Sequence, residues 1–231
     1  MIKAILFDLD NTLIDFMKMK EKACEAAVDA MIGAGLEMKR KDALEMLYNA
    51  YRKYGIEYQK IFQKFLQKAK GRVDYRIVAH GVVAYRKEKE TYLVPYAHVI
   101  PALLELKKKY KLAIISDAPR MEAWLRLTAM NLDEFFDVVI TAADVRKQKT
   151  QFAPFKAALR ALKIKPEEAL MVGDRIARDI KPAKALGIKT CFARYGESEW
   201  IGEKPKHRKR GTSRADFEID DIGELISLKI A

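Results

Sequence analysis

Short apolar segments alternate with amphipathic segments over most of the chain. Residues 3–8 form an apolar run that ends abruptly in acids, as expected of a buried parallel strand whose carboxyl end opens onto a site. The same pattern predicts further strands at residues 112–117, 137–141, 169–174, 189–193 and 217–219. Helices are predicted at residues 100–110, 121–130, 155–162 and 179–186, with a short helix after the last strand.

The segment from residue 16 to residue 91 has a different pattern. Apolar side chains recur there at the spacing of helix faces, and few strands are predicted. Five glycines punctuate the segment and indicate about four helices: Gly33, Gly35, Gly55, Gly71 and Gly81. We interpret residues 16–93 as an all-helical insertion.

Outside the insertion, predicted strands alternate with predicted helices, which is typical of a parallel sheet covered on both faces by helices. We therefore predict an α/β protein with a Rossmann-like, doubly wound core of residues 1–15 and 94–231. Ligands of such sheets bind at the carboxyl ends of the strands. Three predicted strand ends carry polar groups there: Asp8 with Asp10, Ser116, and Asp174.

Composition narrows the class of protein. Half of the 231 residues are apolar and 33% are charged, which excludes wholesale disorder. No uncharged apolar run reaches the ~20 residues of a membrane span, and the first acid comes too early for a signal peptide. Cys24 and Cys191 lie too far apart to suggest a zinc site or a disulfide framework. We expect a cytoplasmic protein with two buried or half-buried thiols and no membrane partner.

The chain is basic. Its 44 lysines and arginines exceed its 32 acids by 12, a balance that favours anionic partners such as phosphorylated metabolites, nucleic acid or an anionic membrane surface. The most basic segment is residues 203–214. It could bind nucleic acid or steer an anionic substrate. We favour a solvated loop instead, so binding of nucleic acid is not expected.

The polar groups at the predicted sheet edge are informative only together. Clustered carboxylates repel one another unless a cation neutralises them, and hard oxygen ligands in that number suit Mg²⁺. A hydroxyl from Ser116 and an ammonium from Lys149, in the loop after the third strand, would complete a phosphate cradle. The predicted cofactor is therefore Mg²⁺.

Four separated motifs carry a resemblance to a known family. They are Asp8-Leu9-Asp10-Asn11-Thr12, then Ser116, then Lys149, then Gly173-Asp174 with Asp179 five residues on. Their order and spacing resemble the signature of the haloacid dehalogenase-like hydrolase superfamily, across almost the whole chain outside the insertion. The insertion, residues 16–93, resembles the family's C1-type cap, which closes over the site and selects the substrate.

The resemblance implies a role for each acid. Asp8 would be the nucleophile that forms an aspartyl-phosphate. Asp10 would be the general acid that protonates the leaving alcohol, and then the base that activates water. Mg²⁺ would be held by the Asp8 carboxylate, the Asp10 backbone carbonyl and Asp174. Asp179 would orient metal-bound water or one of these ligands.

The same resemblance implies that Ser116, Lys149 and Thr12 bind the phosphoryl group. Relatives often have Lys-Pro where this chain has Lys149-Thr150, and Lys147 stays an alternative to Lys149. Asp117 stands where many relatives have Asn, and it adds negative charge near the phosphate unless it turns away. Pro182 is compatible with the helix after the last motif only within the first turn.

These features favour a Mg²⁺-dependent phosphatase that hydrolyses a small phosphomonoester through an aspartyl-phosphate. Asp10 argues against dehalogenation, because the dehalogenases of this family lack that second acid. A phosphotransferase or phosphomutase on the same scaffold is the nearest alternative, and a nucleic-acid-binding protein that uses residues 203–214 is an alternative of another class. The expected partner is a small phosphorylated metabolite, and a homodimer is left open.

Overall fold

The structure is a computed structural model that describes residues 1–198, 201, 211 and 214–229. The chain divides into two compact units. One unit comprises residues 1–15, 94–199 and 205–231, and the other comprises residues 16–93 and 200–204. Most of the basic segment 203–214 lies outside the described residues.

A single parallel sheet organises the first unit, in the strand order β3-β2-β1-β4-β5-β6. Its strands are β1 (Ala4–Phe7), β2 (Lys111–Ser116), β3 (Val138–Thr141), β4 (Ala169–Gly173), β5 (Lys189–Ala193) and β6 (Phe217–Ile219). The central strand β1 pairs with β2 and β4. The predicted strands are confirmed to within one residue at each end, and so is the parallel α/β sheet.

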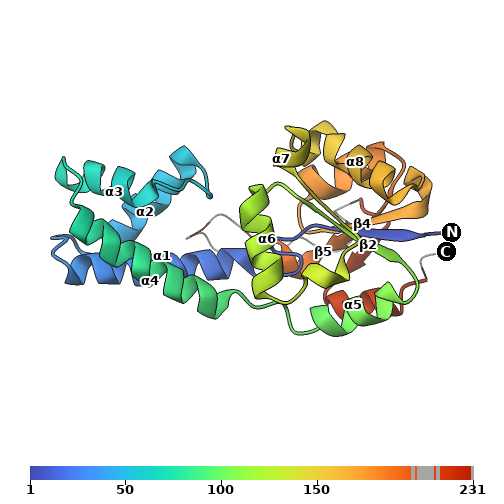
Figure 1. Cartoon of the computed structure of the whole chain (residues 1–231), viewed down its shortest axis with the longest axis horizontal. Coiled ribbons are helices and arrows are strands. Elements are labelled where there is room, and N and C mark those ends of the chain that lie inside the picture. Colours follow the sequence, from blue (N-terminus) through green and yellow to red (C-terminus); the bar gives the residue numbers. More distant parts are fainter. Residues whose placement is uncertain (199–200, 202–210, 212–213, 230–231) are drawn as a thin grey trace. The chain divides into compact units, whose positions relative to one another are not determined.

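Helices cover both faces of this sheet. They are α5 (Val99–Lys107), α6 (Arg120–Ala129), α7 (Ala142–Val145), α8 (Ala153–Leu162) and α9 (Lys181–Ala185). Alternate strand side chains, among them Leu6 and Met171, share one apolar cluster with Phe155 and Leu162 of α8. Figure 1 shows α8 and α5 on opposite sides of the strands, which is the doubly wound arrangement that the sequence predicts.

The segment after β4 differs from the prediction of one continuous helix. A short π-helix, η4 (Ile176–Ile180), runs into α9 (Lys181–Ala185). Pro182 lies in the first turn of α9, where proline is best tolerated in a helix. Single-turn π-helices often mark functional sites, and this one carries Asp179.

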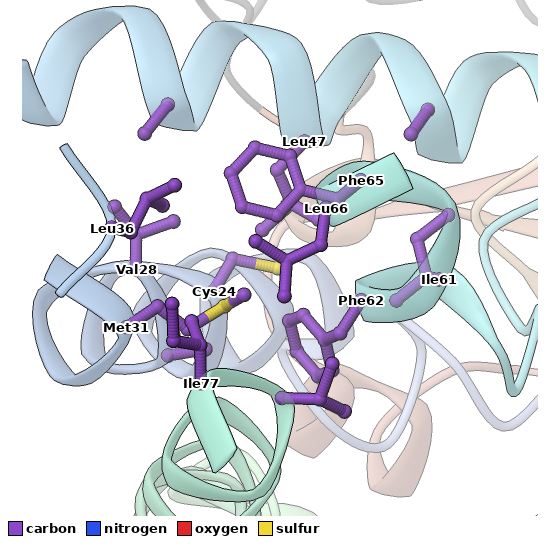
Figure 2. Close-up of a cluster of buried hydrophobic side chains, with 14 of the residues drawn as sticks. Cys24, Val28, Met31, Leu36, Leu47, Ile61, Phe62, Phe65, Leu66 and Ile77 are labelled. Carbon is purple, nitrogen blue, oxygen red and sulfur yellow. The ribbon is translucent and has the colours of Figure 1, made fainter. Parts of the chain in front are cut away.

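The second unit contains α1 (Phe16–Gly33), α2 (Arg40–Tyr54), α3 (Ile61–Lys70) and α4 (Tyr75–Tyr92). Each helix supplies buried side chains to one shared core, among them Cys24, Leu47, Phe65 and Ile77 (Figure 2). This core forms because the apolar positions of each helix recur on one face.

Gly81 contradicts the expectation that every glycine of this segment separates helices. It lies inside α4, and a Cβ atom there would come within 2.7 Å of the Met31 side chain of α1. Close packing of two helices, rather than a turn, explains this glycine.

Two expectations on composition can be checked against the described residues. Cys24 and Cys191 are free thiols, and both are buried, as predicted. Among the described residues, the helices all fall short of the length and apolar character that a membrane crossing requires.

Candidate active site

The register of the three central strands brings the predicted site residues to one edge of the sheet. Phe7 lies opposite Ile114 on one side and Val172 on the other, so the residues after these strands leave the sheet side by side. The backbone N–H of Asp8 donates to the Val172 carbonyl at 2.9 Å. That bond extends the β1–β4 pairing by one residue and fixes the Asp8 backbone beside the end of β4.

Three buried carboxylates meet at this edge. Asp8, Asp174 and Asp179 are 5%, 2% and 0% exposed, and one oxygen of each lies within 4.8 Å of the others. Within the described part of the chain, neither side-chain oxygen of Asp174 has a hydrogen-bond partner. Arg175 lies 3.2 Å from Asp174 Oδ2 as an ion pair without hydrogen-bond geometry. Such a set of hard oxygen donors suits a divalent cation of the Mg²⁺ type.

Burial and mutual repulsion disfavour the ionised form of this cluster. Burial, together with the charges of Asp8 and Asp179, raises the pKa of Asp174 well above its usual value. Burial also raises the pKa of Asp179 to about 6, although the nearby Lys149 ammonium opposes the shift. A second cation close to these carboxylates would relieve the repulsion, because it favours the charged form of each acid.

The position of Asp179 depends on the local backbone after β4. Its Oδ2 accepts the backbone N–H of Arg175 at 2.8 Å, which turns the side chain back towards the strand end. Gly173 leaves the space for it, because a Cβ atom at that position would come within 2.5 Å of Asp179 Cγ. The glycine and the π-helix together place this acid next to Asp174.

Lys149 is the cation within the cluster. It is 2% exposed, and its Nζ lies 2.6 Å from Asp8 Oδ1 and 2.6 Å from Asp179 Oδ1. Burial alone lowers its pKa, but the facing carboxylates outweigh burial and raise the pKa above the usual lysine value. Lys147 is exposed. The geometry therefore favours Lys149 over Lys147 as the lysine of this site.

The side chain of Asp117 supports the segment that carries Lys149. Its Oδ1 accepts the backbone N–H of Lys149 at 3.0 Å, and Arg178 lies 3.6 Å from its Oδ2. The Asp117 carboxylate thus links the end of β2 to the segment that carries Lys149.

The two predicted hydroxyl groups differ in their surroundings. Ser116 is 1% exposed, and its Oγ accepts the backbone N–H of Ala118 at 3.1 Å. That bond uses an acceptor lone pair, so the Ser116 hydroxyl can still donate its hydrogen. Thr12 is fully buried, and its hydroxyl has no hydrogen-bond partner among the residues that the structure describes. The structure does not join Thr12 to the cluster through a side-chain hydrogen bond.

Asp10 lies at the same strand end, beyond the buried trio. Its side chain is 22% exposed, and its Oδ2 accepts from Nη1 of Arg126, a residue of α6, at 2.8 Å. Arg126 was not predicted as a site residue, although it is almost completely buried, at 1% exposure.

The loop after Asp8 is supported by Tyr195 and Gly196, which were not predicted as part of the site. Asn11 adopts a left-handed φ of 62°, and the Tyr195 hydroxyl donates to the Thr12 carbonyl at 2.8 Å. Gly196 packs so closely that a Cβ atom there would lie 1.7 Å from the Asn11 carbonyl oxygen. Only a glycine fits at this contact, because the neighbouring atom belongs to the backbone.

Comparison with known proteins places this geometry in a family. The sequence profile described as haloacid dehalogenase-like hydrolase matches residues 5–193. A glyceraldehyde 3-phosphate phosphatase of Methanocaldococcus jannaschii is 38% identical over 229 residues, covering 99% of this chain and 97% of that protein. The Pyrococcus furiosus protein of the same name is 34% identical, covering 98% of this chain and 92% of that protein.

A solved structure agrees with these sequence matches. The crystal structure of a HAD (haloacid dehalogenase-like) phosphatase from Thermococcus onnurineus matches with a TM-score of 0.68 and 25% sequence identity. The match covers 98% of this chain and 97% of that one. The sequence resemblance to the haloacid dehalogenase-like hydrolases is confirmed. The chain is an enzyme that belongs to the haloacid dehalogenase-like hydrolase family, and the three relatives described above are phosphatases.

Proposed function

We propose that this protein is a Mg²⁺-dependent phosphatase that hydrolyses a small phosphomonoester through an aspartyl-phosphate at Asp8. The observation that carries the proposal is the buried cluster of Asp8, Asp174 and Asp179 around the ammonium of Lys149. It offers a nucleophile, a metal-ligand set and a phosphate-binding cation at one sheet edge. The names of the phosphatase relatives support the same class of reaction.

The residues present fit a Mg²⁺ ion. Both oxygens of Asp174 are buried without a hydrogen bond in the described part of the chain, as expected of a ligand whose partner is a cation. The Asp8 carboxylate, the Asp10 carbonyl and Asp174 would hold the ion, and its charge would neutralise phosphoryl oxygens. Asp179 is already engaged by Lys149 and by the Arg175 N–H, which supports an orienting role for it.

The reaction consists of two displacements at phosphorus. An Asp8 carboxylate oxygen attacks phosphorus, the ester P–O bond breaks, and Asp10 gives its proton to the leaving alkoxide. Asp10 then takes a proton from water, the water oxygen attacks phosphorus, and the bond to Asp8 breaks to release inorganic phosphate. Ser116 and Lys149 hold the phosphoryl oxygens during both steps.

The substrate class follows from the relatives. Two proteins that match almost the whole chain are named for glyceraldehyde 3-phosphate. A three-carbon phosphomonoester of that kind is therefore the first substrate to test. We also propose that the helical unit of residues 16–93 acts as a C1-type cap over the site and selects among such esters. The proposal rests on the resemblance to the family and on the separate helical core of that unit.

A panel of phosphomonoesters tests the function. Phosphate release is measured for glyceraldehyde 3-phosphate, phosphoglycolate, sugar phosphates and nucleotides, with Mg²⁺ and with EDTA. We expect phosphate release for a small ester, its loss in EDTA and its return on adding Mg²⁺. Hydrolysis that is indifferent to EDTA would remove the metal from the proposal. Transfer of phosphate to an added alcohol or sugar, without release into water, would favour a phosphotransferase.

A further inference from the structure

A buried arginine outside the four motifs contacts the proposed acid-base residue. Arg126 Nη1 donates to Asp10 Oδ2 at 2.8 Å across 116 residues of sequence. We propose that Arg126 is a positioning residue, whose guanidinium holds the Asp10 carboxylate in the orientation from which it exchanges a proton with the ester oxygen. This inference rests on the proposed function and assigns a new residue to it.

Arg126 is suited to orienting a proton donor and unsuited to acting as one. A guanidinium stays protonated in proteins, so it cannot be the acid or the base itself. Its charge-assisted hydrogen bond to a carboxylate is shorter and stronger than a neutral one. Since the bond fixes Oδ2, it restricts rotation of the Asp10 carboxyl group about its own axis.

The helix that carries Arg126 is itself rigidly placed. Ala123 and Leu127, on α6 beside the arginine, are both 0% exposed, so this helix face packs into the core. The arginine therefore reaches Asp10 from a packed helix and not from a surface loop, and such support is what precise placement of a catalytic group requires. A buried cation on an apolar helix face is costly unless it is paired, and Asp10 supplies that pairing.

Among the contacts that the structure describes, the two buried cations of the site meet different carboxylates. Lys149 lies against Asp8 and Asp179, and Arg126 forms an ion pair with Asp10. The trio of metal-site carboxylates thus has its own lysine. Arg126 contacts Asp10, whose proposed role is to move a proton rather than to bind a metal through its side chain.

Substrates with different leaving groups separate positioning from mere structural support. An alkyl phosphate needs a proton on its leaving alkoxide, whereas p-nitrophenyl phosphate releases a stable phenolate without one. The value of kcat/KM depends on the steps up to and including departure of the leaving group. If Arg126 positions the acid, its loss lowers kcat/KM for the alkyl ester selectively. A structural defect would lower both values together.

The test compares Arg126→Met, Arg126→Lys and Arg120→Met with the wild type. Arg120→Met is the matched control, because it removes an arginine of the same helix that pairs with Asp144 instead. We expect Arg126→Met to lower kcat/KM for glyceraldehyde 3-phosphate by about 10- to 100-fold, as misplacement of a catalytic group does. The value for p-nitrophenyl phosphate should change by less than about threefold, because no acid is needed there.

Arg126→Lys keeps the charge without the planar fork, and we expect it to fall between Arg126→Met and the wild type. Thermal unfolding followed by circular dichroism shows whether Arg126→Met folds. If it does not, the two substrates are compared with Arg126→Lys instead. In an Asp10→Asn background, Arg126→Met should cause no further change in the ratio of the two substrates.

Failure of the inference and failure of the proposed function look different. Suppose that Asp10→Asn lowers kcat/KM selectively for the alkyl ester. If Arg126→Met then lowers kcat/KM equally for both substrates, or for neither, the positioning role of Arg126 is overturned. If Asp8→Asn and Asp10→Asn themselves leave both activities intact, the proposed function is wrong and the role of Arg126 falls with it.

Discussion

One buried lysine offsets part of the negative charge of three buried acids at this site. Lys149 lies within 2.6 Å of both Asp8 and Asp179. Removing one partner of a buried charge network leaves the others uncompensated, at a cost of about 3–5 kcal/mol. We therefore predict that Lys149→Met lowers the free energy of unfolding by an amount of that order in metal-free buffer near neutral pH.

Urea denaturation measures this change, and Lys147→Met is its control. Lys147 is exposed, so its loss should alter the free energy of unfolding by no more than about 0.5 kcal/mol. Equal stability of the two variants would mean that Lys149 does not neutralise the cluster.

The two acids that follow β1 have separable roles. Asp8→Asn should abolish turnover while the fold persists, because an amide is a poor nucleophile for phosphorus. Asp10→Asn should lower kcat for an alkyl phosphate by at least about 100-fold, because general acid-base catalysis usually contributes at least that factor to the rate. Steady-state assays together with circular dichroism check both variants, and substantial activity in Asp8→Asn would reject that residue as the nucleophile.

The predicted residues that meet at the sheet edge lie at strand ends or in the recognised motifs, whereas Arg126 of α6 was not predicted. Asp8, Ser116 and Asp174 were predictable because an apolar strand that stops at a polar residue is visible in the sequence. Arg126 was not, because a helical pattern does not tell which distant group its side chain meets. The available signal was a charged residue between the apolar neighbours Ala123 and Leu127.

At the scale of elements, the junction of β4 and η4 sets the geometry of the acids. A Cβ atom on Gly173 would collide with Asp179, at 2.5 Å from its Cγ. Gly173→Ala should therefore displace Asp179 and weaken Mg²⁺ binding by about 10- to 100-fold, the usual effect of disturbing groups around metal ligands.

Calorimetric titration with Mg²⁺ measures that affinity. Gly33→Ala is a matched control, since Gly33 also has an ordinary backbone φ and a Cβ atom there meets nothing within 4 Å. Unchanged Mg²⁺ affinity in Gly173→Ala would show that the position of Asp179 does not matter for the ion.

Helices and strands were predicted correctly where the local sequence pattern determines them. The predictions were wrong where contacts with other parts of the chain determine the structure. Strand positions followed from apolar runs, because a strand buried on both faces leaves that mark in the sequence. The π-helix was missed because the apolar spacing of this segment does not distinguish a widened turn from an α-helical one. Gly81 was misjudged, since only the neighbouring helix explains it.

At the scale of the whole molecule, the acids of the site couple stability to pH. Burial raises the folded-state pKa of Asp179 from 3.8 to about 6, and that of Asp174 is raised as well. Between the unfolded and folded pKa values, the native protein binds more protons than the unfolded chain. The contribution of these groups to stability is therefore present at low pH and lost as pH rises through this range.

Mg²⁺ should reverse this loss, because it binds the ionised acids and competes with protons. The increase in Tm caused by Mg²⁺ should consequently be larger at pH 7.5 than at pH 5. Differential scanning fluorimetry at both pH values measures it, with KCl at matched ionic strength as the control. An equal Mg²⁺ effect at both pH values would contradict a site built from these carboxylates.

The most direct test of the account is chemical identification of residue 8 during turnover. Protein mixed with glyceraldehyde 3-phosphate and Mg²⁺ is quenched with borohydride, which reduces an acyl phosphate to an alcohol, and the peptide containing residue 8 is analysed by mass spectrometry. If Asp8 is the nucleophile, it is converted to homoserine only when substrate is present. Continued phosphate release, with Asp8 unmodified at every quench time and another residue reduced in its place, would contradict it.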